Sequence, residues 1–424
     1  LIFENSLICE GRFILTDGIL HFFVALQLLS LSYACQHPSF ISILLNGLTL
    51  GFACSCKHTA WALMPLNGIF HMYFIINKYK NMSINQKIQL FGNDSKKDLR
   101  FFARFLFDVL FRGGCLFGLT LFVYYASFVI HIIILCFNGP GKGFLNKTVR
   151  NTLLSGQWNS LEPQTKKLIG PSMIYRVFTL NVEMHRANMR IDTFHPYESR
   201  PINWPLLTSC YVGFLTFDED KEINMIGNLF VYYSAFLALV YIVLSDVIRM
   251  FRLVLIQFLK IKTNYYVSPN WKHHFILFGY LLHYLPFFLI PRCMFLYHYH
   301  IPLIFAVMAA GSIFDLIFFI PAQIRSISKQ KNELSTILPR YLAIRDKSHK
   351  SFDEFGSIVR SVLKRHEYND LFFISGVVFM IILMIFVIAG FVIWSPFTYG
   401  STINHNNLAL RIYRTFLKLD EAYD

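Results

Sequence analysis

The segment GRFILTDGIL places two ionisable residues, Arg12 and Asp17, at the start of a long apolar run. Ionisable side chains inside or at the edge of a membrane span are costly, and they often mark a functional site. The two residues are close enough along a helix to pair or to face one polar cavity. The alternative is that Arg12 reaches the membrane surface and Asp17 caps the helix.

A second polar cluster lies in FHPYESRPINWPLL, from Phe194 to Leu207. Its prolines exclude a regular helix. Arg200 offers a permanent planar cation suited to phosphate, and His195 and Tyr197 offer hydrogen-bond donors. Trp204 suits the membrane interface. The segment predicts a rigid interfacial loop that holds an anionic lipid headgroup, or alternatively an aromatic belt with a structural arginine.

A third cluster lies in HYLPFFLIPRCMFLYHYHIP, which crosses a turn between two apolar runs. Its polar residues are His283, Tyr284, Arg292, His298 and His300. Histidines are common metal ligands, but we find no convincing ligand spacing with a carboxylate here. We therefore expect phosphate binding or structural hydrogen bonds in this segment, and we assign no metal site.

The rest of the chain must position these clusters in a membrane. Hydrophobic residues make up 55%, charged residues only 15%, and the mean hydropathy is +0.46. Helices of about 20 apolar residues cross a bilayer, and we expect about eight of them here. The alternating strands of a membrane barrel are absent from the pattern. The predicted spans are Phe13 to Ala34, Phe40 to Cys56, His58 to Asn77, Leu110 to Phe137, Ile226 to Val247, His273 to Ile290, Phe295 to Ile320 and Leu371 to Trp394.

Basic residues predict the orientation of these spans. Three segments, 78–104, 249–272 and 325–365, hold seven, five and ten lysines and arginines. Basic loops favour the cytoplasmic side, and anionic lipid there accounts for much of the +14 net charge without a nucleic-acid partner. The resulting division is a bundle at 1–137 with a cytoplasmic loop at 78–108, a lumenal loop at 138–225, a second bundle at 226–394 with a cytoplasmic loop at 322–370, and a lumenal tail at 395–424.

Three sequons for N-glycosylation, at Asn81, Asn93 and Asn146, fall on different sides of this arrangement. Only Asn146 lies in the predicted lumenal loop. We therefore expect a glycan at Asn146 and none at the other two.

Taken together, the clusters resemble the protein O-mannosyltransferase family. ENSLICEGRFILTDGILHFF is similar to that family's segment in which a glutamate, an arginine and an aspartate open a span. HPYESRPINWP resembles its HPY-SRPW-WP element, and HYLPFFLIPRCMFLYHY its HYLPFF-R-FLHHY turn. WSPFTYG, at 394–400, and GPG, at 139–141, are similar to two further elements. These elements occur in family order and cover nearly the whole chain.

The resemblance implies a GT-C-like fold, the multispan fold of glycosyltransferases with lipid-linked donors. Dolichyl-phosphate mannose would donate mannose, with inversion, to serine or threonine hydroxyls of secretory-pathway proteins. The enzyme would act in the endoplasmic reticulum membrane, often as a dimer with a homologous subunit. We assign no cofactor, and a divalent metal requirement stays open. The predicted donor- and phosphate-binding residues are Arg12, Asp17, His195, Tyr197, Arg200, Trp204, His283, Tyr284, Arg292 and His298.

The sequence departs from the family pattern in three respects. The family's acidic Asp-Glu pair, which would supply the catalytic base, is expected upstream of Leu1, so no catalytic residue is assigned. The loop at 138–225 shows no threefold repeat, so we expect no β-trefoil MIR domain in it. Asn203 stands where the family prefers an aromatic residue. Two alternatives remain: a transferase for another polyprenyl-phosphate sugar, and a transporter or non-catalytic partner subunit.

Overall fold

A computed structural model describes residues 1–13, 15–82, 97–154, 170–191, 194–208, 210–218, 221–258, 271–319 and 371–402. Its α-helices are α1 (Asn5–Gly11), α2 (Thr16–Gln36), α3 (Phe40–Cys56), α4 (Leu63–Lys80), α6 (Lys97–Gly113), α7 (Leu119–Ile134), α8 (Lys147–Arg150), α9 (Met173–Met189), α10 (Leu229–Phe258), α11 (Trp271–Tyr284), α12 (His300–Phe314) and α15 (Leu371–Tyr399). Shorter helical turns include η1 (His58–Ala62), η2 (Gly114–Gly118), η5 (Leu285–Leu289), η6 (Leu296–Tyr299) and η7 (Asp315–Phe319). Strands β1 (Val212–Asp218) and β2 (Lys221–Met225) form an antiparallel hairpin.

The predicted helical membrane architecture is confirmed, whereas the number of spans is not. Five helical stretches among the described residues are long and apolar enough to cross a membrane: Thr16–Gln36, His58–Lys80, Asp98–Ile134, Leu296–Phe319 and Phe373–Tyr399. Helix α3 is apolar but has only 17 residues. Helix α11 has 14 residues. It ends where Pro286 begins the tighter turn η5, because proline cannot continue the α-helical hydrogen bonding.

Close helix packing in the first half depends on small residues of α3. A Cβ atom added at Gly47 would lie 2.4 Å from the Cys115 carbonyl oxygen, and one at Gly51 would lie 2.8 Å from the Val123 Cβ. Small side chains allow this approach between helix backbones in a bilayer, where packing replaces the hydrophobic effect. Helix α3 consequently lies against both α2 and α7.

A buried polar network joins α2, α3 and α4. Gln27 donates hydrogen bonds from Nε2 to Asn46 Oδ1 at 3.2 Å and to Asn67 Oδ1 at 2.8 Å. Asn46 Nδ2 in turn donates to Asn67 Oδ1 at 3.0 Å. All three side chains are fully buried. Lipid offers no hydrogen-bond partners, so these contacts between amides fix the relative positions of the three helices, although Gln27 Oε1 has no partner among the described residues.

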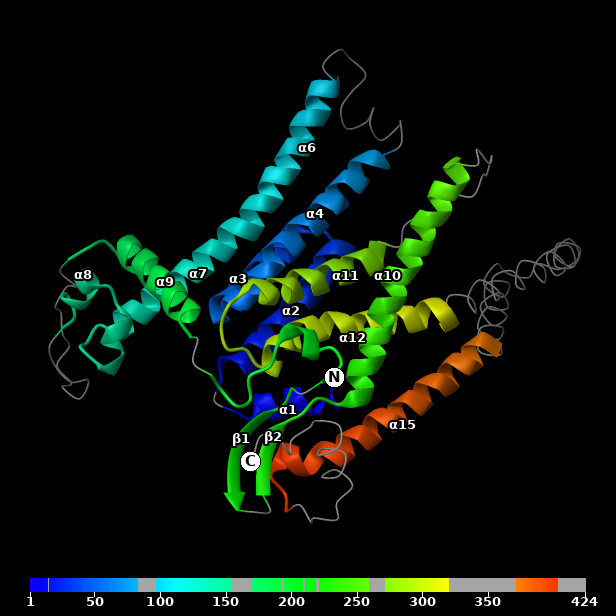
Figure 1. Ribbon diagram of the computed structural model, residues 1–424. Coiled ribbons are helices and arrows are strands. Elements are labelled where there is room, and N and C mark those ends of the chain that lie inside the picture. The colour runs from blue at the N-terminus through cyan, green and yellow to red at the C-terminus, as the bar shows by residue number, and fades with distance from the viewer. Residues whose placement is uncertain are drawn as a thin grey trace, which may run out of the picture.

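The two predicted bundles share one hydrophobic core. It contains Leu20, Leu50 and Leu66 from the first half and Ala235 and Phe305 from the second. Figure 1 shows the C-terminal end of α4, the start of α6 and the end of α10 at one end of the molecule, and α1 and the β1–β2 hairpin at the opposite end. These three helix ends thus lie together on the side away from α1.

Candidate functional site

Helix α1 is held in place by the buried carboxylate of Glu4. Glu4 accepts hydrogen bonds from the backbone N–H groups of Ser6 (3.2 Å), Leu7 (2.7 Å) and Asn228 (3.0 Å), and from the Ser6 hydroxyl (2.7 Å). The first three donors include two of the groups that a helix start leaves unpaired. The sequence ENS therefore begins a short helix and ties it to the loop that precedes α10.

Arg12 follows α1 and points to the end of the last helix. Its guanidinium donates a 2.5 Å hydrogen bond to the Thr398 carbonyl and lies 4.9 Å from the centre of the Tyr399 ring. Arg12 is exposed, so the guanidinium keeps open donor positions. The WSPFTYG motif and the GRFILTD motif are therefore neighbours in space.

Asp17 pairs with Lys57 rather than with Arg12. The Lys57 ammonium lies 2.6 Å from Asp17 Oδ1 and 5.3 Å from the centre of the Tyr297 ring. Lys57 stands at the break between α3 and η1. The suggestion that Arg12 and Asp17 face each other is therefore not met, because a lysine from another helix end occupies the position beside the carboxylate.

Arg292 and His298 form the next polar group along this face. Arg292 contacts His298 Nε2 at 2.6 Å and also donates to the Asn188 side chain. His298 stacks on Trp204 with ring centres 6.2 Å apart, and the Trp204 indole N–H donates to Ser199 Oγ at 2.9 Å. Trp204 is fully buried. It supports the histidine from behind and does not take the membrane-interface position that its residue type predicts.

Two hydrogen bonds to backbone carbonyls fix the proline-rich loop against the third cluster. The Ser199 N–H donates to the Met294 carbonyl at 2.8 Å, and the Tyr284 hydroxyl donates to the Pro201 carbonyl at 2.8 Å. Arg200 lies between these two anchors and is exposed. In the described part of the chain, its guanidinium makes no hydrogen bond or ion pair. The backbone at Arg200 is thus held in place while its guanidinium is unengaged among the described residues, which suits a phosphate-binding role.

The remaining predicted residues contact their own loop or the interior of the bundle. His195 is exposed, and its Nδ1 accepts a hydrogen bond from the Tyr197 N–H at 3.2 Å. Tyr197 packs on the hairpin at Gly213, where an added Cβ would lie 2.7 Å from the tyrosine hydroxyl. His283 is buried, bonds to the Gly279 carbonyl at 2.8 Å and stacks on Phe305. We therefore place His283 behind the polar face and not on it.

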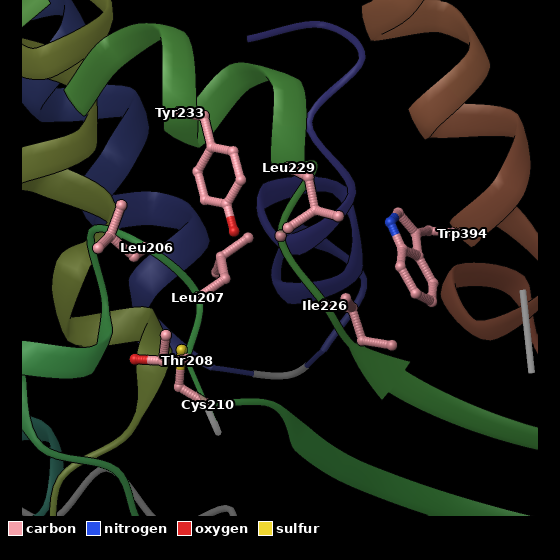
Figure 2. Close-up of a pocket in the computed structure, with 9 residues that line it drawn as sticks. Leu206, Leu207, Thr208, Cys210, Ile226, Leu229, Tyr233 and Trp394 are labelled. Atoms are coloured by element: carbon pink, nitrogen blue, oxygen red, sulfur yellow. The ribbon is translucent and has the colours of Figure 1, made fainter. Parts of the chain in front are cut away.

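A small apolar hollow, partly open to the outside, lies beside this face (Figure 2). It is lined by Leu206, Leu207, Thr208, Cys210, Ile226, Gly227, Leu229, Tyr233 and Trp394. The loop that carries Arg200 continues directly into this wall. Leu207 has a φ of 54°, a left-handed conformation that leucine rarely adopts, and it turns the loop toward the start of α10. An apolar wall next to the Arg200 guanidinium suits an anionic lipid.

Known protein families match most of this chain. The profile described as the C-terminal four TMM region of protein-O-mannosyltransferase matches residues 173–415. The chain belongs to the protein O-mannosyltransferase family. A second family profile, described as dolichyl-phosphate-mannose-protein mannosyltransferase, matches residues 1–136. The motifs at both ends of the chain are therefore family elements, as the sequence predicts.

Similar proteins of this family come from fungi and a mammal. Dolichyl-phosphate-mannose–protein mannosyltransferase 1 of Candida albicans is 29% identical over 37% of this chain and 18% of its own length. Protein O-mannosyl-transferase 1 of Rattus norvegicus is 32% identical over 28% of this chain and 16% of its own. The chain thus aligns with less than a quarter of the length of these curated relatives.

A solved structure shares the fold. The S. cerevisiae protein O-mannosyltransferase Pmt1-Pmt2 complex bound to the sugar donor matches with a TM-score of 0.63 at 15% identity. The match covers 97% of this chain and 76% of that chain. The predicted GT-C-like multispan fold is therefore confirmed at the level of the fold.

Sequence reasoning overlooked several residues of this region. Lys57, the single residue between the predicted spans Phe40 to Cys56 and His58 to Asn77, supplies the partner of Asp17. Glu10 and His21 were assigned no role, although both approach His300. The available indication was the rarity of buried ionisable side chains in a membrane bundle, which applies to all of these residues.

Proposed function

We propose that the protein transfers mannose from dolichyl-phosphate mannose to serine and threonine hydroxyls of proteins that enter the secretory pathway, with inversion of the sugar carbon. The observation that carries this proposal is that the segment with Arg200 is hydrogen-bonded to the segment with Arg292, and that Lys57 reaches Tyr297 of that same second segment. Loss of a phosphate leaving group builds negative charge, which fixed cations stabilise.

The residues have distinct roles in this proposal. Arg200 and Arg12, which keep open donor positions, bind the donor phosphate. Lys57 adds positive charge while it holds Asp17. Arg292 orients His298, which contacts the sugar or phosphate as a hydrogen-bonding group. The apolar hollow beside the loop receives the first part of the polyprenyl chain.

The cellular setting follows from the same reasoning. We propose that the protein is a multi-pass protein of the endoplasmic reticulum membrane, with this face and the 138–225 loop on the lumenal side. A homologous subunit is the proposed partner, because the fold neighbour is a complex of two such proteins. The basic helix ends seen together in Figure 1 then face the cytoplasm.

The decisive experiment measures mannose transfer to a serine- or threonine-containing peptide by the protein in its native membrane assembly. Arg200→Ala is expected to lower transfer at least tenfold, because a charge-assisted phosphate contact contributes about 1.5–3 kcal/mol. Arg249→Ala is the matched control. Arg249 pairs with Asp246 at 2.9 Å near the opposite end of α10 and should retain normal transfer.

Two results would contradict the proposal. Normal transfer by a stably inserted Arg200→Ala protein would remove Arg200 from the donor site. Efficient transfer from a different polyprenyl-phosphate sugar, with none from the mannose donor, would replace the proposed substrate by the alternative one.

A further inference from the structure

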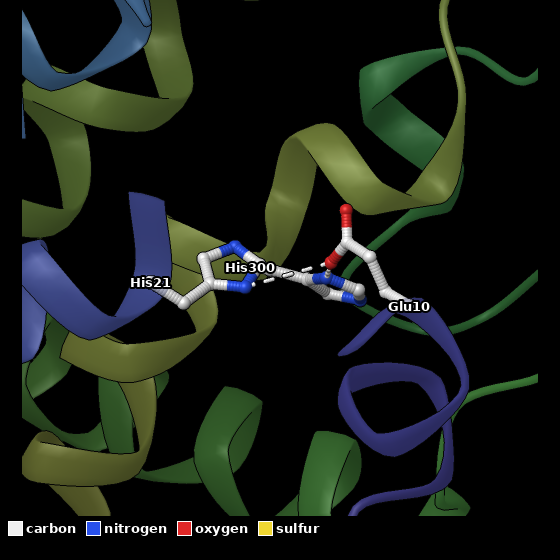
Figure 3. Close-up of side chains that lie close together, drawn as sticks. All are labelled: Glu10, His21 and His300. Atoms are coloured by element: carbon white, nitrogen blue, oxygen red, sulfur yellow. Dashed lines mark hydrogen bonds and ion pairs between the residues drawn. The ribbon is translucent and has the colours of Figure 1, made fainter. Parts of the chain in front are cut away.

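Three potential metal ligands converge in the interior, beside the proposed donor site but not part of it. Glu10 comes from α1, His21 from the second turn of α2, and His300 from the first residue of α12 (Figure 3). One ligand atom of each lies within 4.8 Å of the others. Glu10 and His300 are fully buried, and the His21 side chain is 14% exposed.

The contacts among these groups leave one donor atom unused. Glu10 Oε2 bonds to His300 Nδ1 and lies 3.6 Å from His21 Nδ1, too far for a hydrogen bond. Glu10 Oε1 has no hydrogen-bond partner among the described residues. A buried carboxylate oxygen without a partner is costly, and such atoms call for an explanation. An ion held between the three side chains would supply it.

The surroundings of His300 fix the face that its ring presents. His300 Nε2 lies 2.8 Å from Ser6 Oγ, and the Ser6 hydroxyl lies 2.7 Å from Glu4 Oε2. In the structure Nδ1 donates to Glu10. When a metal ion takes the place of that proton, the remaining proton lies on Nε2, the histidine donates to the serine, the serine donates to Glu4, and the Nδ1 lone pair binds the ion. Metal-binding histidines are oriented in this way by a carboxylate behind them.

Charge balance also favours a cation at this position. Glu4 and Glu10 are both fully buried, and in the part of the chain described by the structure neither pairs with a lysine or arginine. Arg12, the nearest basic residue in sequence, is engaged by Thr398 and Tyr399. Histidines bind a metal in their neutral form, and with His21 and His300 neutral the two buried carboxylates carry a charge that one divalent ion compensates.

We propose that Glu10, His21 and His300 bind one zinc ion. Zinc takes histidine nitrogen and carboxylate oxygen ligands at about 2.0–2.2 Å, which places tetrahedral ligand atoms roughly 3.4 Å apart. The separation between Glu10 and His21 already matches this spacing. Rotation of the Glu10 carboxylate, whose last torsion is broad, opens the shorter contact to His300. The ion fastens α1 between α2 and α12, and thereby positions Arg12 and Asp17 at the two ends of the intervening segment.

The test measures bound metal in the full-length protein. The protein is purified in lipid nanodiscs with a tag that contains no histidine, exposed to zinc and dialysed, and its metal content is determined by mass spectrometry. About one zinc ion per chain is expected for the unaltered protein, and far less for Glu10→Gln and His21→Asn. Ser6→Ala should weaken zinc affinity roughly 10–100-fold, because it removes the support of His300.

A matched control and a second readout guard against misfolding. Asp246→Asn alters another carboxylate, which lies 2.9 Å from His274, and should leave the zinc content unchanged. Cobalt(II) in place of zinc should produce visible absorption bands that His21→Asn abolishes. A chelator should lower the melting temperature of the unaltered protein but not of His21→Asn. If Glu10→Gln fails to fold, His21→Asn is the decisive variant, because the His21 side chain is partly exposed.

The proposal is overturned if the zinc-treated protein retains no stoichiometric metal. It is equally overturned if Glu10→Gln and His21→Asn retain as much zinc as the unaltered protein. Glu10 and His300 would then form only a buried ion pair. These outcomes are independent of mannose transfer, so they leave the proposed function untouched.

Discussion

Replacement of Lys57 by methionine tests whether the Asp17–Lys57 pair holds the candidate site together. The ammonium lies 2.6 Å from Asp17 Oδ1, and the two side chains are 25% and 8% exposed. Removal of one partner from a fully buried pair costs about 3–5 kcal/mol, whereas an exposed pair contributes at most about 1 kcal/mol. Since Lys57 is partly exposed, we expect Lys57→Met to lower the free energy of unfolding by about 2–3 kcal/mol.

A double variant that also changes Asp17 shows whether the loss of stability comes from the Asp17–Lys57 pair. Asp17→Asn combined with Lys57→Met removes the carboxylate that the single variant leaves unpaired. The double variant should therefore be at least about 1 kcal/mol more stable than Lys57→Met alone, within the coupling range of contacting residues. The free energy of unfolding of all four proteins can be measured by titration with a denaturing detergent in mixed micelles, followed by tryptophan fluorescence.

A control and a refuting result complete this test. Lys78 pairs with Asp108 at 2.7 Å but is 47% exposed. Lys78→Met should therefore cost less than about 1 kcal/mol. If Lys57→Met and Asp17→Asn combine additively within about 0.5 kcal/mol, the two side chains do not stabilise each other. The reasoning from burial would then be wrong for this pair.

Three further predictions concern other parts of the molecule. Asn46→Ala removes four hydrogen bonds within the membrane, of which each contributes on average about 0.6 kcal/mol. Detergent unfolding should show a loss of about 2 kcal/mol. Asn146 should carry a glycan that an endoglycosidase removes and that Asn146→Gln lacks, whereas a glycan at Asn81 would reverse the proposed topology. Burial raises the pKa of Cys9 to about 12. The thiolate is therefore scarce below that pH, and mass spectrometry should find Cys9 alkylated only after unfolding.

Much of the fold follows from hydrophobic runs, because the bilayer imposes both length and helical conformation on a span. The ends of the helices were less predictable. Helix α10 continues through Phe258, beyond the predicted end at Val247, since its last turns combine apolar residues with arginines. Helix α1 was not expected at all. Its seven residues are stabilised by the Glu4 cap and by contacts with distant helices, which local sequence does not reveal.

The roles of the candidate site residues stay predictions, and their pairing was not predictable. The motifs predicted Arg200 and Arg292 on one face, and a backbone hydrogen bond from Ser199 to Met294 joins the two segments that carry them. The partner of Asp17 was not predictable, because Lys57 lies on a different helix end and only tertiary packing joins the two. The convergence of Glu10, His21 and His300 was not predictable for the same reason. Glu10 and His300 are 290 positions apart in the sequence, and only tertiary packing brings them together.

The attachment of α1 also determines when the site can form during synthesis. Asn5 donates hydrogen bonds to the Phe391 carbonyl and to Thr398 Oγ1, and the latter contact spans 393 positions. Translation reaches these two acceptors only in the second half of α15. Until then, the Asn5 amide of a nascent chain lacks these partners, whereas Glu4 and Glu10 can already meet Asn228 and His300. Completion of α15 is thus the step that supplies the hydrogen-bond acceptors of Asn5 in α1.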